Sequence, residues 1–511
     1  MLVSTDASGA APPAAEITET HLSVVAFVGD RAYKAKKSVD LGFVDFTSVE
    51  ARRVACEREV ALNRRLAPDV YLGVATLHDV DGSVAEHLVV MRRMPPERRL
   101  STLVTDGDPR VADQLRRLAR QLAAFHAAAD RSPAIAAAGS VDAVAANWEE
   151  SFTQLDPLVG DLVDGEVHDR VRSLVRRYLA GRGDLFADRM RSGQICDGHG
   201  DLQAADIFCL DDGPRVLDCI EFNDRFRYGD VANDVAFLAM DLDRLGAPEL
   251  GRQFLDEYRE FSGATWPPSL VEHFVAYRAH VRCKVACLRA VQLDGAARAE
   301  PAGEAARLAR MALRYLERAR VRLVLVGGLP GTGKSTLAAG VGAATGWTVL
   351  RSDAVRKESA GLDPSTPAPA TFGTGLYDPA ATAATYDELL RRAGVALRGG
   401  ESVVLDATWL DPAQRAAAAR VADDALADLD AVVCELPAAE AAQRMAARAA
   451  RGGDPSDATA EVAARLAHDA APWPEALVVD TGAPPEVAVT EALRLLEVPA
   501  LAPDVARSPG A

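Results

Sequence analysis

The sequence has few cysteines, no long apolar run and no excess of basic residues, and each absence excludes a class of protein. The seven cysteines among 511 residues are scattered without a Cys-x-x-Cys pair, which argues against a zinc site and favours a reducing, cytoplasmic setting. No apolar run approaches the ~18 residues of a membrane-spanning helix, so no membrane association is expected. A formal net charge of −17 argues against a protein that coats nucleic acid, although a local pocket can still be basic.

The chain is longer than one hydrophobic core usually supports, since single cores stop growing near ~250–300 residues. Hydropathy and turn signals predict a disordered lead-in, a small sheet with one helix, a helical region, a region of alternating strands and helices, and a disordered tail. The predicted boundaries of these five segments are 1–20, 21–95, 96–319, 320–498 and 499–511.

The strongest motif follows an apolar, β-branched run at residues 323–326. Gly328 to Ser335 fits G-x-x-x-x-G-K-[ST], and a helix-forming stretch follows it. Glycines let backbone N–H groups close around phosphates where a Cβ would clash, and the helix N-terminus and Lys334 add favourable charge. The Ser335 hydroxyl is a ligand suited to Mg²⁺. The residues predicted to bind the nucleoside triphosphate are Gly328, Gly331, Thr332, Gly333, Lys334, Ser335 and Thr336.

Strands and helices alternate around this motif. A regular βαβα order predicts an α/β domain with a parallel, doubly wound sheet. The expected strands lie at 322–326, 347–350, 402–405, 430–435 and 476–479.

A second group of chemically suggestive residues lies in the middle of the chain. Asp201 follows His199-Gly200 in a short loop, and Asp206 and Asp218 come after it. An Asp in such a loop can accept the proton of a substrate hydroxyl, and two further carboxylates can hold Mg²⁺ on the phosphates of ATP. A single loop Asp is usually a turn residue or a helix cap. The combination favours a catalytic site.

This stretch resembles the catalytic loop H-G-D-x-x-x-x-N of the aminoglycoside phosphotransferase and protein-kinase-like superfamily. The resemblance covers roughly residues 21–315 and implies an α+β bilobal kinase-like fold, with its N-lobe at 21–95 and a helical C-lobe at 96–319. It implies that Asp201 is the catalytic base and that Asp218 binds the metal. The family's metal-binding Asn is Asp206 here, which adds a negative charge to the site.

The same resemblance implies a strand lysine that holds the α- and β-phosphates, paired with a glutamate on the following helix. Glu59 is the expected partner, and Lys34 or Lys36 is the lysine. These two lysines share one face of a strand, so alternation alone does not separate them; Lys36 is the preferred candidate. Residues 89–94 correspond to the hinge that binds adenine.

Residues 321–498 resemble small-molecule P-loop kinases of the gluconate kinase, shikimate kinase, polynucleotide kinase and zeta-toxin kind. The resemblance implies that Asp353 contacts the acceptor hydroxyl, with a helix cap as the alternative. Asp406 ends a strand in a Walker-B-like position and would hold Mg²⁺ or the substrate. Arg444 and Arg448 precede a lid-like loop and would neutralise charge on ATP, with a solvated helix face as the alternative. Because Ala follows Asp406, a motor ATPase is disfavoured.

The sequence therefore predicts an ATP- and Mg²⁺-dependent phosphotransferase with two kinase modules. Each would transfer the γ-phosphate to a hydroxyl of a small molecule: a sugar, an aminosugar, an aminoglycoside or a related metabolite. The alternative is that one half is catalytic and the other is a nucleotide-binding regulatory module, or that the first half is a protein-kinase-like stress regulator. Asp206 makes the first half the likelier regulator, and the short connection after Asp218 disfavours a protein substrate.

Overall fold

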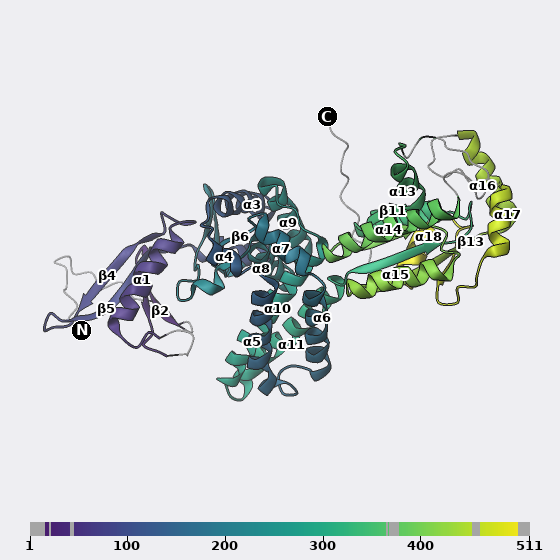
Figure 1. The fold of residues 1–511 in the computed structure, drawn as a ribbon. Helices are drawn as coiled ribbons and strands as arrows, with labels where there is room; N and C mark the ends of the chain where they lie inside the picture. Colours follow the sequence, from purple (N-terminus) through teal and green to yellow (C-terminus); the bar gives the residue numbers. More distant parts are fainter. Residues whose placement is uncertain are drawn as a thin grey trace. The chain divides into compact units, whose positions relative to one another are not determined.

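The structure of the protein is a computed structural model that describes residues 16–19, 22–40, 45–363, 366, 378–451 and 460–498. Its internal contacts divide the chain into two compact units (Figure 1). None of the helices in the described ranges combines the length and the apolar character that crossing a lipid bilayer requires. The N-terminal unit consists of the chain up to Arg172, Phe186–Trp266 and Leu270–Leu316, and the C-terminal unit of Ser173–Leu185, Pro267–Ser269 and the chain from Glu317.

The N-terminal unit begins with a five-stranded antiparallel sheet in the order β1-β2-β3-β5-β4. Helix α1 packs on this sheet through Cys56 and Val60, which join Val89 and Met91 of the sheet in one apolar cluster. The Ser48 side chain caps α1 by accepting from the Ala51 N–H. The elements are β1 (Glu16–Glu19), β2 (Ser23–Val28), β3 (Arg31–Lys36), α1 (Val49–Asn63), β4 (Tyr71–His78) and β5 (Val84–Arg92).

Strand β1 corrects the predicted start of ordered structure. Residues Glu16–Glu19 fall inside the lead-in that the sequence predicts to be disordered, yet they pair antiparallel with Val24–Phe27 of β2. All four residues are exposed, so hydrophobic burial does not hold them. The ladder of backbone hydrogen bonds to an edge strand does, and composition carries no sign of it.

The rest of the N-terminal unit is helical and encloses two short antiparallel pairs, β6 with β9 and β7 with β8. The pair β7–β8 is a hairpin that turns at Asp211 and Asp212. The strands are β6 (Ile195–Asp197), β7 (Ile207–Leu210), β8 (Gly213–Val216) and β9 (Tyr228–Asp230). The α-helices are α2 (Leu100–Thr105), α3 (Val111–Ala128), α4 (Pro133–Ala137), α5 (Val141–Leu155), α6 (Gly165–Ala180), α7 (Gly183–Arg191), α8 (Val231–Arg244), α9 (Pro248–Ser262), α10 (Pro268–Val291) and α11 (Ala296–Arg318). The stretch Ser173–Leu185, which spans the end of α6 and the start of α7, belongs to the C-terminal unit.

Helix α11 contains two residues that are uncommon in the interior of a helix. Pro301 and Gly303 would normally discourage a helix, but the helix runs through both residues. Pro301 is buried, so packing offsets the hydrogen bond that proline cannot donate.

The C-terminal unit contains a five-stranded parallel sheet in the order β11-β12-β10-β13-β14. All five predicted strands are present, and the predicted α/β class is confirmed. The strands are β10 (Arg322–Gly327), β11 (Thr348–Arg351), β12 (Val403–Asp406), β13 (Asp428–Glu435) and β14 (Leu477–Asp480). The helices are α12 (Lys334–Thr345), α13 (Ser352–Ser359), α14 (Pro379–Arg398), α15 (Pro412–Asp424), α16 (Ala438–Arg451), α17 (Ala460–Asp469) and α18 (Pro485–Leu495).

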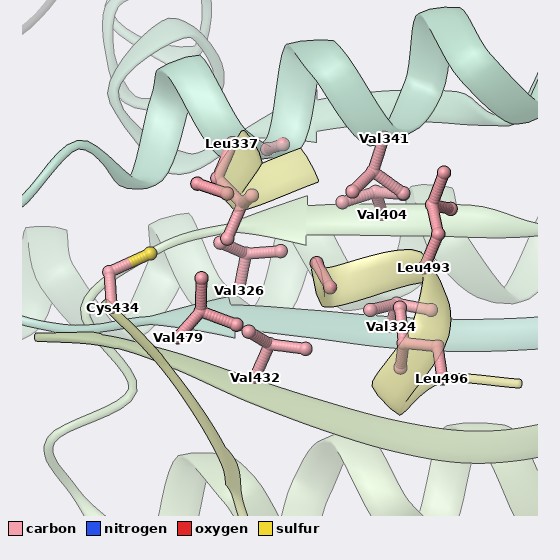
Figure 2. Packing of buried hydrophobic residues seen from close by; sticks show 13 residues of the cluster. Val324, Val326, Leu337, Val341, Val404, Val432, Cys434, Val479, Leu493 and Leu496 are labelled. Carbon is pink, nitrogen blue, oxygen red and sulfur yellow. The ribbon is translucent and has the colours of Figure 1, made fainter. Parts of the chain in front are cut away.

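Valines from neighbouring strands form the core of this sheet. Val324, Val404 and Val432 are fully or almost fully buried against Leu337 of α12 and Leu493 of α18 (Figure 2). Near-continuous apolar strands are typical of a parallel sheet covered on both faces. Because the strands are parallel, the loops after β10, β11, β12 and β14 emerge at one edge, where ligands bind in open α/β sheets.

Candidate active sites

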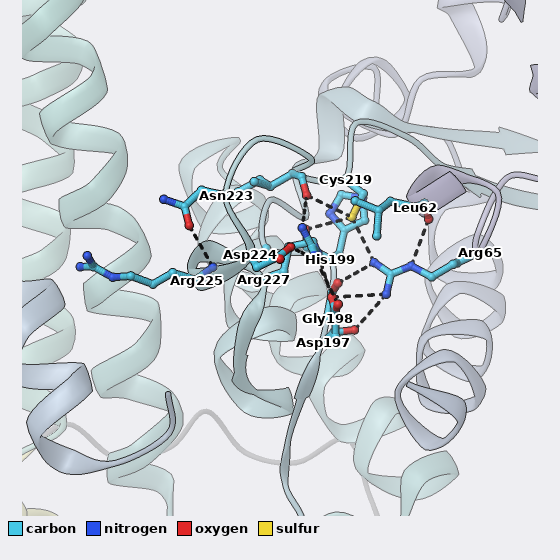
Figure 3. A network of polar contacts seen from close by, with 12 residues as sticks. Leu62, Arg65, Asp197, Gly198, His199, Cys219, Asn223, Asp224, Arg225 and Arg227 are labelled. Atoms are coloured by element: carbon cyan, nitrogen blue, oxygen red, sulfur yellow. Dashed lines mark hydrogen bonds and ion pairs between the residues drawn. The ribbon is translucent and has the colours of Figure 1, made fainter. Parts of the chain in front are cut away.

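The loop that carries Asp201 is held by two arginines that come from different parts of the N-terminal unit. Arg65, just after α1, donates to the Asp197 carbonyl at 3.1 Å and to the Gly198 carbonyl at 2.9 Å. Arg227 binds both carboxylate oxygens of Asp197 at 2.8 and 3.0 Å (Figure 3). These charge-assisted hydrogen bonds hold the loop from both sides.

Asp234, in the first turn of α8, also binds the backbone of this loop. Its carboxylate accepts the backbone N–H groups of His199 at 2.7 Å and Gly200 at 2.8 Å, and His126 Nε2 lies 3.1 Å away. Burial alone would raise the pKa of Asp234, but these partners hold it below the ordinary value. A Cβ at Gly198 would lie 2.6 Å from the Asp234 carboxylate, so glycine is required for this close approach.

Asp201 follows this anchored turn. Burial raises the pKa of its carboxyl to about 6, and the nearby charge of Arg282 opposes that rise. Gln203 donates to Asp201 Oδ2 at 2.8 Å and orients the carboxylate. Burial also disfavours the charged form of His199 and lowers its pKa to about 4, so its imidazole is neutral at pH 7. The carboxylate is thus oriented and has a pKa suited to proton transfer near neutral pH.

Both strand lysines reach Glu59 on α1. Lys34 Nζ lies 2.9 Å from one Glu59 oxygen and Lys36 Nζ lies 2.5 Å from the other. Lys34 also bridges to Asp218 at 2.5 Å, whereas Lys36 pairs with Glu221. Burial alone would raise the pKa of Glu59, but the two lysines reverse this effect and keep it ionised. The structure therefore brings together the predicted lysines, glutamate and aspartate.

Asp218 has a left-handed backbone, with a φ of 65°. Only a small fraction of residues other than glycine adopt this conformation, and they concentrate at functional sites. The hydroxyl of the buried Tyr71 accepts from the Asp218 N–H at 3.2 Å, and Asn63 accepts from the Cys219 N–H at 2.9 Å. Lys34 holds the pKa of Asp218 below its ordinary value, so the carboxylate is charged.

Asp206 fits a site for a divalent cation. Burial and the negative charges of Asp218 and Asp201 raise its pKa well above the ordinary value, and a cation would relieve this repulsion. Carboxylate oxygens are the ligands that Mg²⁺ prefers. Within the described ranges, no three His, Cys, Asp or Glu side chains are already gathered as a ligand cluster. The donor chemistry fits Mg²⁺ bound together with nucleotide phosphates.

The phosphate loop of the C-terminal unit has the backbone that its motif requires. Gly328, Gly331 and Gly333 have φ values of 131°, 84° and 91°, which L-residues with a side chain rarely adopt. A Cβ at Gly331 would lie 2.6 Å from the Ala441 carbonyl oxygen. Lys334 opens α12 and donates to the Leu329 carbonyl at 3.0 Å, so its ammonium lies over the loop.

Thr481 and Arg444 brace this loop from β14 and α16. The Thr481 hydroxyl donates to the Thr332 carbonyl at 2.5 Å, and Arg444 donates to the Thr481 carbonyl at 2.8 Å. An ideal Cβ built on Gly333 would lie 3.5 Å from a guanidinium nitrogen of Arg444, so this arginine lies beside the loop that is predicted to bind phosphates. Thr481 was not predicted; its only sequence signal is its place directly after a strand.

The remaining predicted residues lie around the same sheet edge. Asp406 ends β12, is 5% exposed and pairs with Arg351 Nε at 3.2 Å. Asp353 lies in the first turn of α13, whose N-cap is Arg351, so Asp353 is not the cap. The side chain of Arg448 and the lid at 452–459 lie outside the described residues.

Known proteins resemble both parts of the chain. Residues 44–269 match the model of the Phosphotransferase enzyme family, and residues 323–472 match the model of an AAA domain. The uncharacterized protein Rv2004c of Mycobacterium tuberculosis is 46% identical over 412 residues, which cover 81% of this chain and 82% of that protein.

Among solved structures, a choline/ethanolamine kinase family protein from Mesorhizobium loti is 16% identical, with a TM-score of 0.37 over 61% of this chain and 94% of that chain. A sugar kinase from Janibacter sp. HTCC2649 is 23% identical, with a TM-score of 0.27 over 35% of this chain and 95% of that chain.

The two family models therefore show a fusion, in which a domain similar to aminoglycoside phosphotransferases is followed by a domain that carries a phosphate-loop motif and resembles P-loop kinases. The fusion predicted from the two motifs is confirmed. The chain belongs to the same family as the Mycobacterium tuberculosis protein Rv2004c.

Proposed function

We propose that each unit transfers the γ-phosphate of ATP to a hydroxyl of a small molecule. The observation that carries the proposal is the convergence of Lys34, Glu59 and Asp218 beside the anchored loop of Asp201. These are the charges that phosphoryl transfer needs: a cation for phosphate oxygens, carboxylates for Mg²⁺ and a base for the acceptor. The phosphate loop at Gly328–Ser335 supplies a second, independent nucleotide site.

In the N-terminal unit, Asp201 orients the acceptor hydroxyl and receives its proton. The acceptor oxygen forms a bond to the γ-phosphorus, and the bond from that phosphorus to the β–γ bridging oxygen breaks, leaving ADP. Asp206 and Asp218 would hold Mg²⁺, which neutralises charge on the phosphates when it is bound. Asp234 keeps the loop in place through the His199 and Gly200 N–H groups.

Lys34, rather than the sequence-preferred Lys36, is proposed to contact the phosphates. Lys34 reaches Asp218, whose side chain is 48% exposed. Lys36 is almost fully buried between Glu59 and Glu221 and lies 5.8 Å from the centre of the Phe46 ring. Because Lys36 is buried between two carboxylates, its proposed role is to hold Glu59 in position. Lys34 instead lies at the accessible part of the site, next to Asp218.

Lys34→Met and Lys36→Met should therefore have different effects. Lys34→Met should lower kcat by about 10²–10³-fold, because the charge proposed to hold the α- and β-phosphates of ATP in position is lost. Lys36→Met should chiefly lower the free energy of unfolding, by about 3–5 kcal/mol, because Glu221 is left buried without its cation. Turnover and urea unfolding of both variants measure this, and a larger loss of kcat in folded Lys36→Met would reverse the assignment.

In the C-terminal unit, Lys334 and Arg444 are proposed to neutralise charge that develops on the γ-phosphate. Arg444 already lies beside the loop at Gly333, and Arg448 would join it from the same helix. Ser335 and Asp406 would hold Mg²⁺, and Asp353 would contact the acceptor hydroxyl. Asp406 lies at the carboxyl edge of the sheet beside β10, where a bound nucleotide is expected.

A regulatory N-terminal unit is the second candidate, and Asp206 is the observation that favours it. The extra buried carboxylate raises the cost of bringing ATP phosphates close unless a cation accompanies them. Such a unit would bind nucleotide and modulate the other without turnover of its own.

The proposal is tested by transfer of labelled γ-phosphate to a panel of sugars, sugar acids, sugar phosphates, aminosugars, nucleosides and aminoglycosides. The wild-type chain should label at least one acceptor, and the double variant Asp201→Asn with Lys334→Ala should label none. Labelling by the double variant at the wild-type rate would show that neither site performs the transfer.

A further inference from the structure

Helix α10 places two arginines beside the catalytic loop of the N-terminal unit. Arg278 is 7% exposed and donates to the Gly200 carbonyl at 3.0 Å and to the Asn233 carbonyl at 3.2 Å. Its guanidinium also lies 4.8 Å from the centre of the Phe237 ring. These contacts are with backbone oxygens and an aromatic ring, so they do not neutralise the positive charge that Arg278 places next to Gly200.

Arg282 lies one helical turn further along the same face of α10, because residues four apart in a helix are neighbours. Its Nε is buried and has no hydrogen-bond partner within the described ranges. It forms no ion pair with a carboxylate in that part of the chain, and its charge nevertheless acts on Asp201 more strongly than any other cation. A buried guanidinium nitrogen without a partner is costly, so it marks a place for a ligand acceptor group.

Arg278 lies at the loop of the proposed base, since it donates to the Gly200 carbonyl, and Arg282 follows it by one turn of α10. The cations that act on Asp206 are Lys34 and Arg99, and those that act on Asp218 are Lys34 and Lys36. The phosphate and metal end of the site thus has its own positive charges. Arg278 and Arg282 instead act on the proposed base.

Two carboxylates near this part of α10 already have partners of their own, and the first is Asp234, which accepts the His199 and Gly200 N–H groups. The guanidinium of Arg278 lies 5.7 Å from the ring centre of Tyr277. The charges of Arg225 and Glu150 also act on the pKa of this tyrosine. Arg225 binds Glu150 at 2.5 Å, so that carboxylate is already paired.

We propose that the acceptor of the N-terminal site carries an anionic group, a carboxylate or a phosphate ester, that binds Arg282 while its hydroxyl reaches Asp201. This inference rests on the proposed role of Asp201. Arginine presents a planar fork of donors that matches both groups. The same charge repels a cationic acceptor, so an aminoglycoside or aminosugar is disfavoured.

Four probes that share a six-carbon framework test the charge preference directly: glucose, glucosamine, gluconate and glucose 6-phosphate. Binding is measured by calorimetry on Lys334→Ala, with saturating AMPPNP and Mg²⁺ so that phosphate groups of the probes do not enter the nucleotide sites. Gluconate or glucose 6-phosphate should bind at least about 10-fold more tightly than glucose, and glucosamine should bind most weakly. Comparison of the two anions distinguishes a carboxylate from a phosphate acceptor.

Arg282→Gln should weaken binding of the preferred anionic probe by about 10–100-fold, the range for hydrogen bonds to a charged group. Arg282→Lys should restore part of the affinity, and Arg289→Gln, an exposed arginine on the same helix, should leave it unchanged. The inference is wrong if the four probes bind equally well or equally weakly, or if Arg282→Gln leaves the anionic probe unaffected. Because binding needs no turnover, anion binding without phosphorylation would contradict the proposed function and leave this inference standing.

Discussion

Replacing Asp201 with Asn is expected to lower kcat of the N-terminal site by about 10²–10⁴-fold, the usual contribution of a general base. The substitution keeps the size of the side chain and one oxygen that can accept from Gln203, so the anchored loop should remain folded. The loss arises because a carboxamide does not accept the proton of the acceptor hydroxyl. Turnover of each acceptor on the panel, measured in the Lys334→Ala background, isolates this site.

The pH profile gives the same experiment a second readout. Burial raises the pKa of Asp201 to about 6, so the carboxylate is the base above that pH and is protonated below it. The rate of the N-terminal site should fall about 10-fold per pH unit below pH 6, as expected when a single base must be ionised. Asp201→Asn should remove this dependence from any residual rate.

Asp169→Asn is a suitable control because Asp169 is an exposed residue of α6. It should leave both the rate and the pH profile unchanged. If Asp201→Asn retains full turnover while folded, Asp201 is not the base and the N-terminal unit is better described as regulatory.

Lys334→Ala is expected to lower kcat of the C-terminal site by about 10²–10³-fold. Removing one group that stabilises the charge of a transition state usually lowers kcat by this factor. Lys334 contacts the Leu329 carbonyl across its own loop, and the glycine φ values do not depend on it, so the loop should keep its shape. The rate is measured in the Asp201→Asn background.

Arg494→Ala provides the control for that measurement, because Arg494 is exposed on α18 and pairs with Glu491 at 2.7 Å. Unchanged turnover in Lys334→Ala would restrict the phosphate loop to nucleotide sensing. Loss of turnover at both sites in either single variant would instead show that the two units depend on each other.

Much of this molecule could be predicted from local patterns. The phosphate loop was recognisable because its chemistry needs glycines, a lysine and a hydroxyl at fixed spacing between a strand and a helix. The five parallel strands were visible as short apolar runs separated by helical stretches. The loop at His199–Asp201 was proposed as catalytic, and Asp218 as a metal ligand, because each lies in a short stretch that resembles a known motif.

Residues that act across the fold were harder to predict. Thr481 supports the phosphate loop from a strand almost 150 positions later, and nothing in its local sequence marks that contact. Arg278 and Arg282 have the spacing of any solvated helix face. Strand β1 was missed because backbone pairing, not side-chain burial, holds it in the sheet.

The sequence by itself was enough to predict two nucleotide sites, the first built on Asp201, Asp206 and Asp218, because short motifs encode that chemistry. The tertiary structure decided which carboxylate each of the two strand lysines pairs with. Lys34 and Lys36 lie on one face of β3, and only the packing of α1 and the 218–221 segment against that strand gives Lys34 to Asp218 and Lys36 to Glu221. It also lets the charge of Arg282 act on Asp201, because charges in a buried site act according to distance in space and not along the chain.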